Sequence, residues 1–246
     1  MIENSSTSDP ELPDDTAQAS SRRGYRLFAP LYDLVFGFSL NHGRKLAIAA
    51  LDIRPGDRIL EVGVGSGMAL PLYPGYASIT GIDLSDEMLA RARRKVRQRK
   101  LNQVKMLLQM DVERLSFRDG SFDKAVMMYT VSGFPDPALA MAEVQRVCKP
   151  GATLVIANHF LSERPLMRVF DILLAPLFRL LRYRADLAAD AFIAASGLEV
   201  LDREPANLFG YSTVLVCRSR GAAGLPPRPM AEQIDLDDAE SSPISD

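Results

Sequence analysis

The chain has 246 residues, of which 47% are hydrophobic and 24% are charged, a composition typical of one soluble globular domain with an ample core. It excludes collagen-like, coiled-coil and wholly disordered chains. The formal net charge of −2 hides an uneven distribution, because residues 1–20 hold five acids and no base, and residues 221–246 hold six acids and one base. Residues 21–220 therefore hold 28 bases and 20 acids, a formal charge of +8.

Both ends of the chain are poor in apolar residues, so we expect residues 1–20 and 221–246 to be disordered acidic tails around a folded domain over 21–220. Cys148 and Cys217 lie in apolar stretches, which predicts buried free thiols in a reducing cytoplasm. With two histidines and no cysteine or histidine cluster, we expect no metal site. No signal peptide is recognisable, and no apolar stretch reaches the roughly 20 residues that span a bilayer, so any membrane contact is expected at the surface.

Between the tails, apolar runs rich in β-branched residues alternate with helical patterns, which predicts an α/β fold with a mainly parallel seven-stranded sheet. The predicted strands cover residues 58–62, 78–82, 104–108, 122–128, 153–157, 198–203 and 212–218. We expect the last two to form an antiparallel pair at the sheet edge. The predicted helices cover residues 86–100, 137–148 and 186–195, and a long helical insert covers about 163–183.

Three glycines directly follow the first predicted strand, in the segment Glu61-Val62-Gly63-Val64-Gly65-Ser66-Gly67. Glycines let the backbone turn tightly and let a ligand approach closely. The dinucleotide fingerprint Gly-x-Gly-x-x-Gly fails here, because Met68 stands at its sixth position. Glu61, two residues ahead of the first glycine, suits a ligand that has a cationic amine and no pyrophosphate. The alternative for the three glycines is an ordinary strand-to-helix turn without a ligand.

Two further acids end the next two predicted strands. Asp83 stands 20 residues after Gly63, where an open α/β sheet presents a carboxylate to ribose hydroxyls. Asp111 follows the third strand, where its carboxylate can accept a hydrogen bond from an adenine amino group, and a loop cap is the alternative for this residue. Together with the glycine loop, the two acids predict a nucleoside-containing cofactor.

On these motifs, residues 40–220 resemble the class I S-adenosylmethionine-dependent methyltransferases, which have a Rossmann-like fold. The resemblance implies that Glu61 and the three glycines hold the methionine part of the cofactor, and that Asp83 holds the ribose. It places Leu84, Asp111 and Val112 around the adenine and Tyr129 beside the transferred methyl group. Arg44 is a candidate for binding the cofactor carboxylate.

Two segments are expected to lie over the cofactor-binding part of the domain and to determine the substrate specificity. In residues 21–50, Tyr25 and Tyr32 are seven positions apart and project from one helical face. At these positions the two tyrosine rings can close over the cofactor, or their faces can contact a methylated ammonium group. Residues 160–185 predict an amphipathic helix with leucines on one face and four arginines opposite, as an interfacial helix needs for contact with acyl chains and phosphates. The four arginines are Arg164, Arg168, Arg179 and Arg182. A lid helix packed on the domain core is the alternative.

Seven cations fall within residues 91–100, on the predicted helix after Asp83. A solvated charged face, attraction to anionic lipid and nucleic-acid binding all fit such a run. No aromatic stacking platform or recognition motif is interleaved with the bases, so we expect an anionic membrane surface as the partner and no nucleic acid.

Four segments resemble the bacterial phospholipid N-methyltransferases of the Rhodobacter type: residues 28–33, Gly43-Arg44, residues 60–67 and Asn158-His159-Phe160. The resemblance implies methylation of phosphatidylethanolamine, and of its mono- and dimethyl derivatives, toward phosphatidylcholine by a cytoplasmic protein at the inner face of the membrane. His159 is then a candidate for accepting the amine proton, with a purely hydrogen-bonding role as the alternative. A quinone-precursor or other small-molecule methyltransferase and a non-catalytic lipid-binding module remain open.

Overall fold

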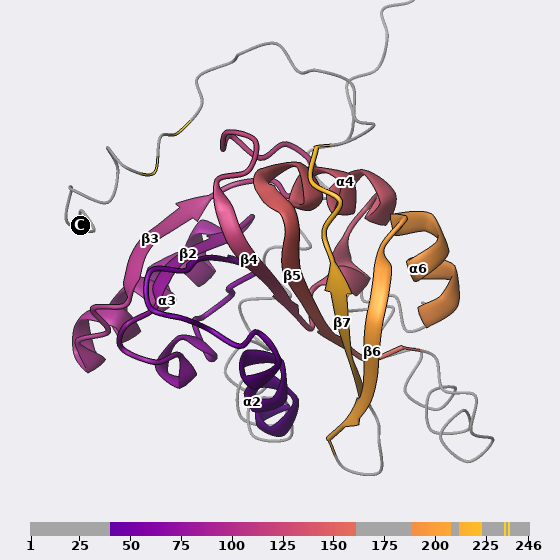
Figure 1. The fold of residues 1–246 in the computed structure, drawn as a ribbon. Helices are drawn as coiled ribbons and strands as arrows, with labels where there is room; N and C mark the ends of the chain where they lie inside the picture. Colours follow the sequence, from indigo (N-terminus) through magenta and orange to yellow (C-terminus); the bar gives the residue numbers. More distant parts are fainter. Residues whose placement is uncertain (1–39, 161–187, 208–211, 223–233, 235, 237–246) are drawn as a thin grey trace, which may run out of the picture. The chain divides into compact units, whose positions relative to one another are not determined.

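The computed structural model describes residues 40–160, 188–207, 212–222, 234 and 236, which belong to one compact unit. Seven strands form one sheet in the order β3-β2-β1-β4-β5-β7-β6 (Figure 1). The strands are β1 (Arg58–Val62), β2 (Ser78–Asp83), β3 (Val104–Gln109), β4 (Phe122–Met128), β5 (Cys148–Asn158), β6 (Glu199–Ala206) and β7 (Ser212–Arg218). Strands β1 to β5 are parallel, and β7 pairs antiparallel with both β5 and β6. The predicted Rossmann-like fold is confirmed, with the antiparallel strand one position inside the edge.

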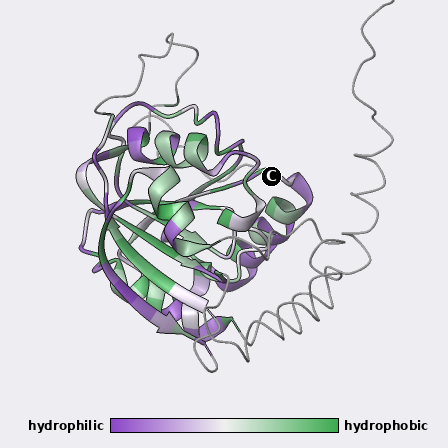
Figure 2. Ribbon diagram, turned by 90° about the vertical axis from the view of Figure 1, so that its right-hand side faces the viewer, coloured by the Kyte–Doolittle hydropathy of each residue, from purple (hydrophilic) through white to green (hydrophobic). Residues whose placement is uncertain are grey.

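In the described part of the chain, four helices cover the two faces of the sheet (Figure 1). They are α2 (Asn41–Ala50), α3 (Asp86–Arg99), α4 (Pro137–Val147) and α6 (Ala189–Ser196), and short 3-10 turns follow β1 (Leu70–Leu72) and β4 (Val131–Gly133). Side chains alternate along β5, so that Leu154 and Ile156 join the core under α4 and α6, while Val155 and Ala157 join the core under α2 and α3. Hydrophobic residues accordingly lie along the central strands (Figure 2).

Local chemistry explains most element boundaries. Ser85 begins α3, since its hydroxyl accepts a hydrogen bond from the Met88 N–H, and Asp136 caps α4 in the same way. Gly197 ends α6 in the left-handed conformation, one residue later than predicted. The outer strand β6 contains Pro205, which the edge of a sheet tolerates. Cys148 and Cys217 are free and buried, as predicted, and burial raises the pKa of the Cys217 thiol to about 12.

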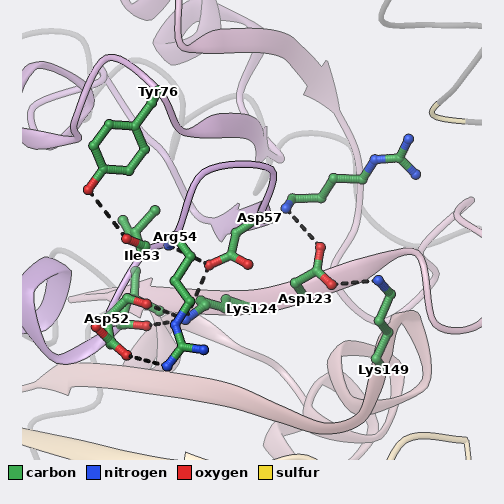
Figure 3. Close-up of polar contacts among 10 residues, drawn as sticks. Asp52, Ile53, Arg54, Asp57, Tyr76, Asp123, Lys124 and Lys149 are labelled. Atoms are coloured by element: carbon green, nitrogen blue, oxygen red, sulfur yellow. Dashed lines mark hydrogen bonds and ion pairs between the residues drawn. The ribbon is translucent and has the colours of Figure 1, made fainter.

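Helix α2 has little stabilisation of its own ends, since its first turn has no side-chain cap and no acid, and its last turn has no base. Side chains from other elements hold it instead. At its C-terminal end, the buried Lys124 amine donates 2.6 Å hydrogen bonds to the carbonyls of Leu51 and Asp52 and lies 3.3 Å from the Asp57 carboxylate (Figure 3). These contacts satisfy carbonyls that a helix end leaves without partners. Lys124 therefore anchors α2 to the N-terminal end of β4, on the side of the sheet opposite the glycine loop.

Four residues of the predicted C-terminal tail, Gly221, Ala222, Ile234 and Leu236, are placed by the structure. The Ile234 N–H donates a 2.7 Å hydrogen bond to the Ser116 carbonyl. The Leu236 side chain is 3% exposed and belongs to the core under α4 and α6. Residues 1–20 and the other residues after 222 lie outside the described part of the chain.

Candidate active site

The glycine loop leaves the C-terminal end of β1, the edge at which parallel α/β sheets bind ligands. Gly63, Gly65 and Gly67 all have positive φ angles, at 70°, 55° and 73°. A Cβ atom at Gly63 would lie 2.2 Å from the Thr130 Oγ1 atom, whereas one at Gly65 would meet no atom within 4 Å. The loop is therefore packed tightly against β4 at its first glycine and faces open space at its second, where a ligand can approach the backbone.

Asp83 ends β2 directly beside this loop. Its Oδ2 atom accepts a 2.8 Å hydrogen bond from the Gly65 N–H, and its Oδ1 atom accepts one of 2.9 Å from the Ser85 N–H. Burial raises the pKa of Asp83, although these hydrogen bonds oppose the shift. The neighbouring Leu84 is 69% exposed, which is unusual for a large apolar side chain next to a buried loop. The carboxylate and the uncovered leucine are consecutive residues at the C-terminal end of β2, beside the glycine loop.

Glu61 is the buried acid of the site, with only 3% of its surface exposed. Burial raises its pKa to about 7, the neighbouring Tyr73 hydroxyl and Arg44 lower it, and the charge of Asp83 raises it. Within the described part of the chain, neither the Glu61 Oε2 atom nor the Tyr73 hydroxyl has a hydrogen bond of good geometry. A buried carboxylate oxygen without a donor is costly, so this site suits a cationic ligand group that donates to it.

Asp111 and Val112 follow β3 at the same edge. Asp111 is exposed, and its Oδ1 atom accepts a 2.9 Å hydrogen bond from the Glu113 N–H. This is the loop cap that the sequence leaves as an alternative, and it uses only one of the two carboxylate oxygens. Val112 is 9% exposed and belongs to the core under α4.

Tyr129 directly follows β4 and adopts a left-handed backbone conformation, with a φ angle of 61°. Its hydroxyl donates to the Leu40 carbonyl at 3.3 Å and accepts from the Asn207 Nδ2 atom at 2.9 Å. The Arg44 guanidinium carbon lies 5.5 Å from the centre of the Tyr129 ring, within cation–π range. The structure thus brings Arg44 of α2 close to both Tyr129 and Glu61.

The end of β5 places Asn158 and His159 next to Tyr129, whose N–H donates to the Ala157 carbonyl at 2.7 Å. His159 is 4% exposed. The Asn158 Nδ2 atom donates 2.8 Å hydrogen bonds to the His159 carbonyl and to the Ser132 hydroxyl. Because a carbonyl can only accept, this contact fixes the orientation of the amide, and the Asn158 Oδ1 atom is an acceptor without a donor among the described residues.

The remaining predicted site residues lie outside the described part of the chain, so the structure does not place them. They are Tyr25, Tyr32, Arg164, Arg168, Arg179 and Arg182. The described residues contain no group of three metal-ligating side chains and no helix long and apolar enough to cross a membrane.

The basic run of α3 lies away from the candidate site. Because β2 and β3 are parallel, α3, which connects them, must run from the C-terminal ends of the strands, where the glycine loop lies, back to their N-terminal ends. Its exposed bases Arg94, Arg97 and Arg99 fall in the half that lies toward these N-terminal ends. Of the earlier bases, Arg91 forms an ion pair with Glu87. The interpretation of this run as a membrane contact therefore receives no support from its position relative to the cofactor loop.

Comparison with known proteins identifies the family. Residues 60–156 match the methyltransferase domain family. The chain is also 40% identical over 193 residues to a phosphatidylethanolamine N-methyltransferase of Cereibacter sphaeroides, an alignment that covers 78% of this chain and 94% of the relative. The chain belongs to the class I S-adenosylmethionine-dependent methyltransferases. A demethylmenaquinone methyltransferase of Thermus thermophilus is 39% identical over 137 residues, covering 52% of this methyltransferase and 60% of that relative.

Solved structures agree on the methyltransferase fold. An S-adenosylmethionine-dependent methyltransferase from Aquifex aeolicus has a TM-score of 0.58 at 20% identity, covering 81% of this chain and 98% of that one. The [4+2]-cyclase SpnF has a TM-score of 0.65 at 21% identity, covering 81% of this chain and 94% of that one. Because the same fold supports a cyclase, the site and not the fold must carry the argument about activity.

The cofactor of this methyltransferase is S-adenosylmethionine, and the geometry of the described residues fits it. Among the residues that the structure describes, none donates a hydrogen bond of good geometry to the buried Glu61 Oε2 atom, and the cofactor has an ammonium group that can do so. The space in front of Gly65 allows close approach, and the exposed Leu84 offers an apolar surface to a base.

Sequence reasoning missed three residues that shape the site. Tyr73 lies beside Glu61 but is 12 positions from it in the chain, and no local pattern connects the two. Thr130, which follows β4, packs against Gly63, which follows the neighbouring strand β1, so closely that a Cβ at position 63 would overlap it. Asn207 lies in the connection between β6 and β7, where an asparagine signals a left-handed turn, yet its side-chain partners come from distant elements.

Proposed function

We propose that this methyltransferase transfers methyl groups to the amine of phosphatidylethanolamine, and to its mono- and dimethyl derivatives, toward phosphatidylcholine. The supporting observation is the 40% identity to the Cereibacter sphaeroides enzyme, in an alignment that covers 94% of that enzyme's length and 78% of this chain. The buried Glu61 Oε2 and Asn158 Oδ1 atoms accept no hydrogen bond from the described residues, which is compatible with cationic and amine ligands.

In this proposal, the residues at the ends of β1 to β3 hold the cofactor. Glu61 accepts from its ammonium group, Arg44 pairs with its carboxylate, and Asp83 binds the ribose hydroxyls. The adenine is surrounded by Leu84, Asp111 and Val112. The methionine part of the cofactor lies against the backbone of Gly63, Gly65 and Gly67. Bound S-adenosylmethionine supplies an electrophilic methyl group on a sulfonium sulfur. The protein's own contribution is to hold the reacting atoms about 3 to 3.5 Å apart and to exclude water.

The residues proposed to handle the acceptor lie at the ends of β4 and β5. The lipid amine must lose its proton before it can attack, and His159 accepts that proton directly or through a water molecule. Tyr129 lies next to this position and lines the methyl-transfer site. Tyr25 and Tyr32 contact the ammonium product, and one or more of Arg164, Arg168, Arg179 and Arg182 bind the lipid phosphate. These last six residues enter on the sequence pattern alone.

We further propose that the protein acts as a peripheral protein at the inner face of the cytoplasmic membrane. The amphipathic insert over 160–185 supports this placement, since its arginines and leucines suit the interface. The exposed bases in the second half of α3 lie toward the N-terminal ends of the strands, away from the glycine loop, so their position adds no support to this placement.

Methylation of a quinone precursor is the second candidate, favoured by the Thermus thermophilus relative and by a 2-phytyl-1,4-naphtoquinone methyltransferase of Synechococcus elongatus at 30% identity over 151 residues. Those alignments cover 52% and 58% of this chain, compared with 78% for the phosphatidylethanolamine enzyme. The difference favours the lipid acceptor.

The deciding experiment supplies radiolabelled S-adenosylmethionine with vesicles that contain phosphatidylethanolamine, and in parallel with vesicles that contain a demethylated quinone. We expect label in the phospholipid between pH 7 and 9. Gly63→Ala serves as the control without cofactor binding, since its Cβ would overlap Thr130. Label in the quinone alone would replace the lipid proposal with the second candidate, and vesicle binding without calorimetric binding of S-adenosylmethionine would indicate a non-catalytic lipid-binding module.

A further inference from the structure

The N-terminal end of α2 is capped by a residue from the other end of the chain. Leu40 stands at the cap position and has no side-chain oxygen, so it leaves the first N–H groups of the helix without a local acceptor. The Asn207 Oδ1 atom accepts a 2.8 Å hydrogen bond from the Gly43 N–H. Asn207 lies between β6 and β7, 164 positions later in the sequence.

The same amide also binds Tyr129. Its Nδ2 atom donates to the Tyr129 hydroxyl at 2.9 Å and to the Ser212 hydroxyl at 2.8 Å. Because the Gly43 N–H can only donate, the atom that faces it must be the amide oxygen, and this fixes the orientation of the whole group. One side chain therefore connects the start of α2, the end of β4 and the start of β7.

The packing of this junction leaves little freedom. A Cβ atom at position 43 would lie 2.0 Å from the Tyr129 hydroxyl oxygen and 3.1 Å from the Asn207 Oδ1 atom, so only glycine fits there. Tyr129 and Asn207 both adopt left-handed backbone conformations, with φ angles of 61° and 63°. Non-glycine residues keep this conformation where the surroundings over-determine it, and such positions concentrate at functional sites.

We propose that Asn207 is a positioning residue for the cofactor site, which holds the Tyr129 hydroxyl and the first turn of α2 so that Arg44 faces the cofactor carboxylate. Arg44 directly follows Gly43 in α2, and its guanidinium lies over the Tyr129 ring. Asn207 touches neither substrate nor cofactor in this scheme and acts through Arg44 and Tyr129. The inference rests on the cofactor roles proposed above for Arg44 and Glu61.

Glu61 provides an electrostatic signal of where Arg44 lies. The titratable and charged groups that act on Glu61 are Tyr73, which follows the turn Leu70–Leu72, Arg44 on α2 and Asp83 on β2. Tyr73 and Arg44 lower the pKa of Glu61, and Asp83 raises it. If Arg44 leaves its place, the pKa of Glu61 rises, and a cofactor that pairs with ionised Glu61 then needs a higher pH to bind.

The test measures calorimetric binding of S-adenosylhomocysteine between pH 6 and 9, which requires no methyl acceptor. Asn207→Gly removes the amide, and glycine accepts the φ angle of 63° without strain. We expect about tenfold weaker binding at pH 7.5 and an upward shift in the pH at which binding is half-maximal. Arg44→Gln should weaken binding by itself, and the double variant should bind no more weakly than Arg44→Gln alone.

Lys100→Gly is the matched control, because Lys100 also has a left-handed conformation, with a φ angle of 52°, but lies at the far end of α3. It should bind S-adenosylhomocysteine like the wild type. Tyr129→Phe keeps the ring under Arg44 and removes the hydroxyl that Asn207 holds, so it should shift the pH dependence in the same direction even if Asn207→Gly does not fold.

The inference is overturned if Asn207→Gly only lowers the unfolding temperature while its binding curve matches the wild type at every pH. It is also overturned if the effects of Asn207→Gly and Arg44→Gln on binding simply add, or if a poorly folding Asn207→Gly is accompanied by an unchanged Tyr129→Phe. Failure of the wild type to bind S-adenosylhomocysteine would instead overturn the cofactor roles on which the inference rests.

Discussion

Replacing Glu61 by glutamine is expected to stabilise the cofactor-free protein above neutral pH while weakening cofactor binding. The Glu61 side chain is buried, and its pKa is raised from 4.5 to about 7, chiefly by burial. Between these two values the folded protein keeps a proton that the unfolded chain has released. The stability of the wild type therefore falls as the pH rises through this window, and the loss is complete above the folded pKa.

The structure sets the size of this effect. The difference between 4.5 and about 7 corresponds to roughly 3 kcal/mol, at about 1.4 kcal/mol per pH unit. Integrated from pH 5 to pH 8, Glu61 destabilises the folded state by roughly 2 to 3 kcal/mol. Glutamine has nearly the same shape and no charge, so the variant lacks this pH-dependent loss.

Urea unfolding of both proteins without cofactor, followed by circular dichroism at pH 5 and pH 8, measures the effect. The free energy of unfolding of Glu61→Gln, relative to the wild type, should increase by roughly 2 to 3 kcal/mol between the two pH values. Glu87→Gln, on the exposed face of α3, is the matched control for the chemical change. A difference between Glu61→Gln and the wild type that stays constant with pH would refute the reasoning.

Calorimetry on the same proteins tests the second half of this prediction. Glu61→Gln should bind S-adenosylhomocysteine at least tenfold more weakly than the wild type at pH 8, because the neutral amide gives the ligand ammonium no counter-charge. Equal affinity in the two proteins would remove Glu61 from the cofactor site.

Three further outcomes are expected. His159→Ala should keep cofactor affinity and lose turnover, with partial recovery at higher pH as more of the amine becomes neutral; unchanged turnover would remove His159 from the mechanism. Gly63→Ala should lower the free energy of unfolding by at least 1 kcal/mol more than Gly65→Ala, because only the first new Cβ overlaps Thr130, and equal losses in urea unfolding would contradict the packing. Lys124→Met should destabilise by about 3 kcal/mol in the same assay, since two carbonyls and a carboxylate lose their partner, and a loss below 1 kcal/mol would show that water replaces the amine.

Local patterns in the sequence were enough to predict the strands and most helices. Strands β1, β4 and β7 begin and end where the sequence predicted, because β-branched runs bounded by turn residues are a local signal. Strand β5 begins five residues earlier than predicted, at Cys148, since the first part of the strand contains Pro150 and Gly151, which local propensity disfavours. The order of the last two strands needed the structure, because antiparallel pairing alone does not say which of them lies against β5.

The placement of the three acids near one another was also predictable, because the C-terminal ends of parallel strands all lie on the same side of the sheet. Glu61, Asp83 and Asp111 are therefore neighbours through the order of the strands, whatever the rest of the chain does. Asp111 illustrates the limit of such reasoning, since the structure shows it as the cap of its own loop and leaves its adenine role as a proposal.

Only the tertiary structure decided the surroundings of those groups. The pKa of Glu61 depends on burial and on Tyr73 and Arg44, and Gly43 must be glycine because Tyr129 approaches it from β4. The cap of α2 comes from Asn207, 164 positions away. A sequence determines local conformation and the faces that seek burial, but the partners of a buried polar group are chosen by packing between distant segments, and no local pattern records them.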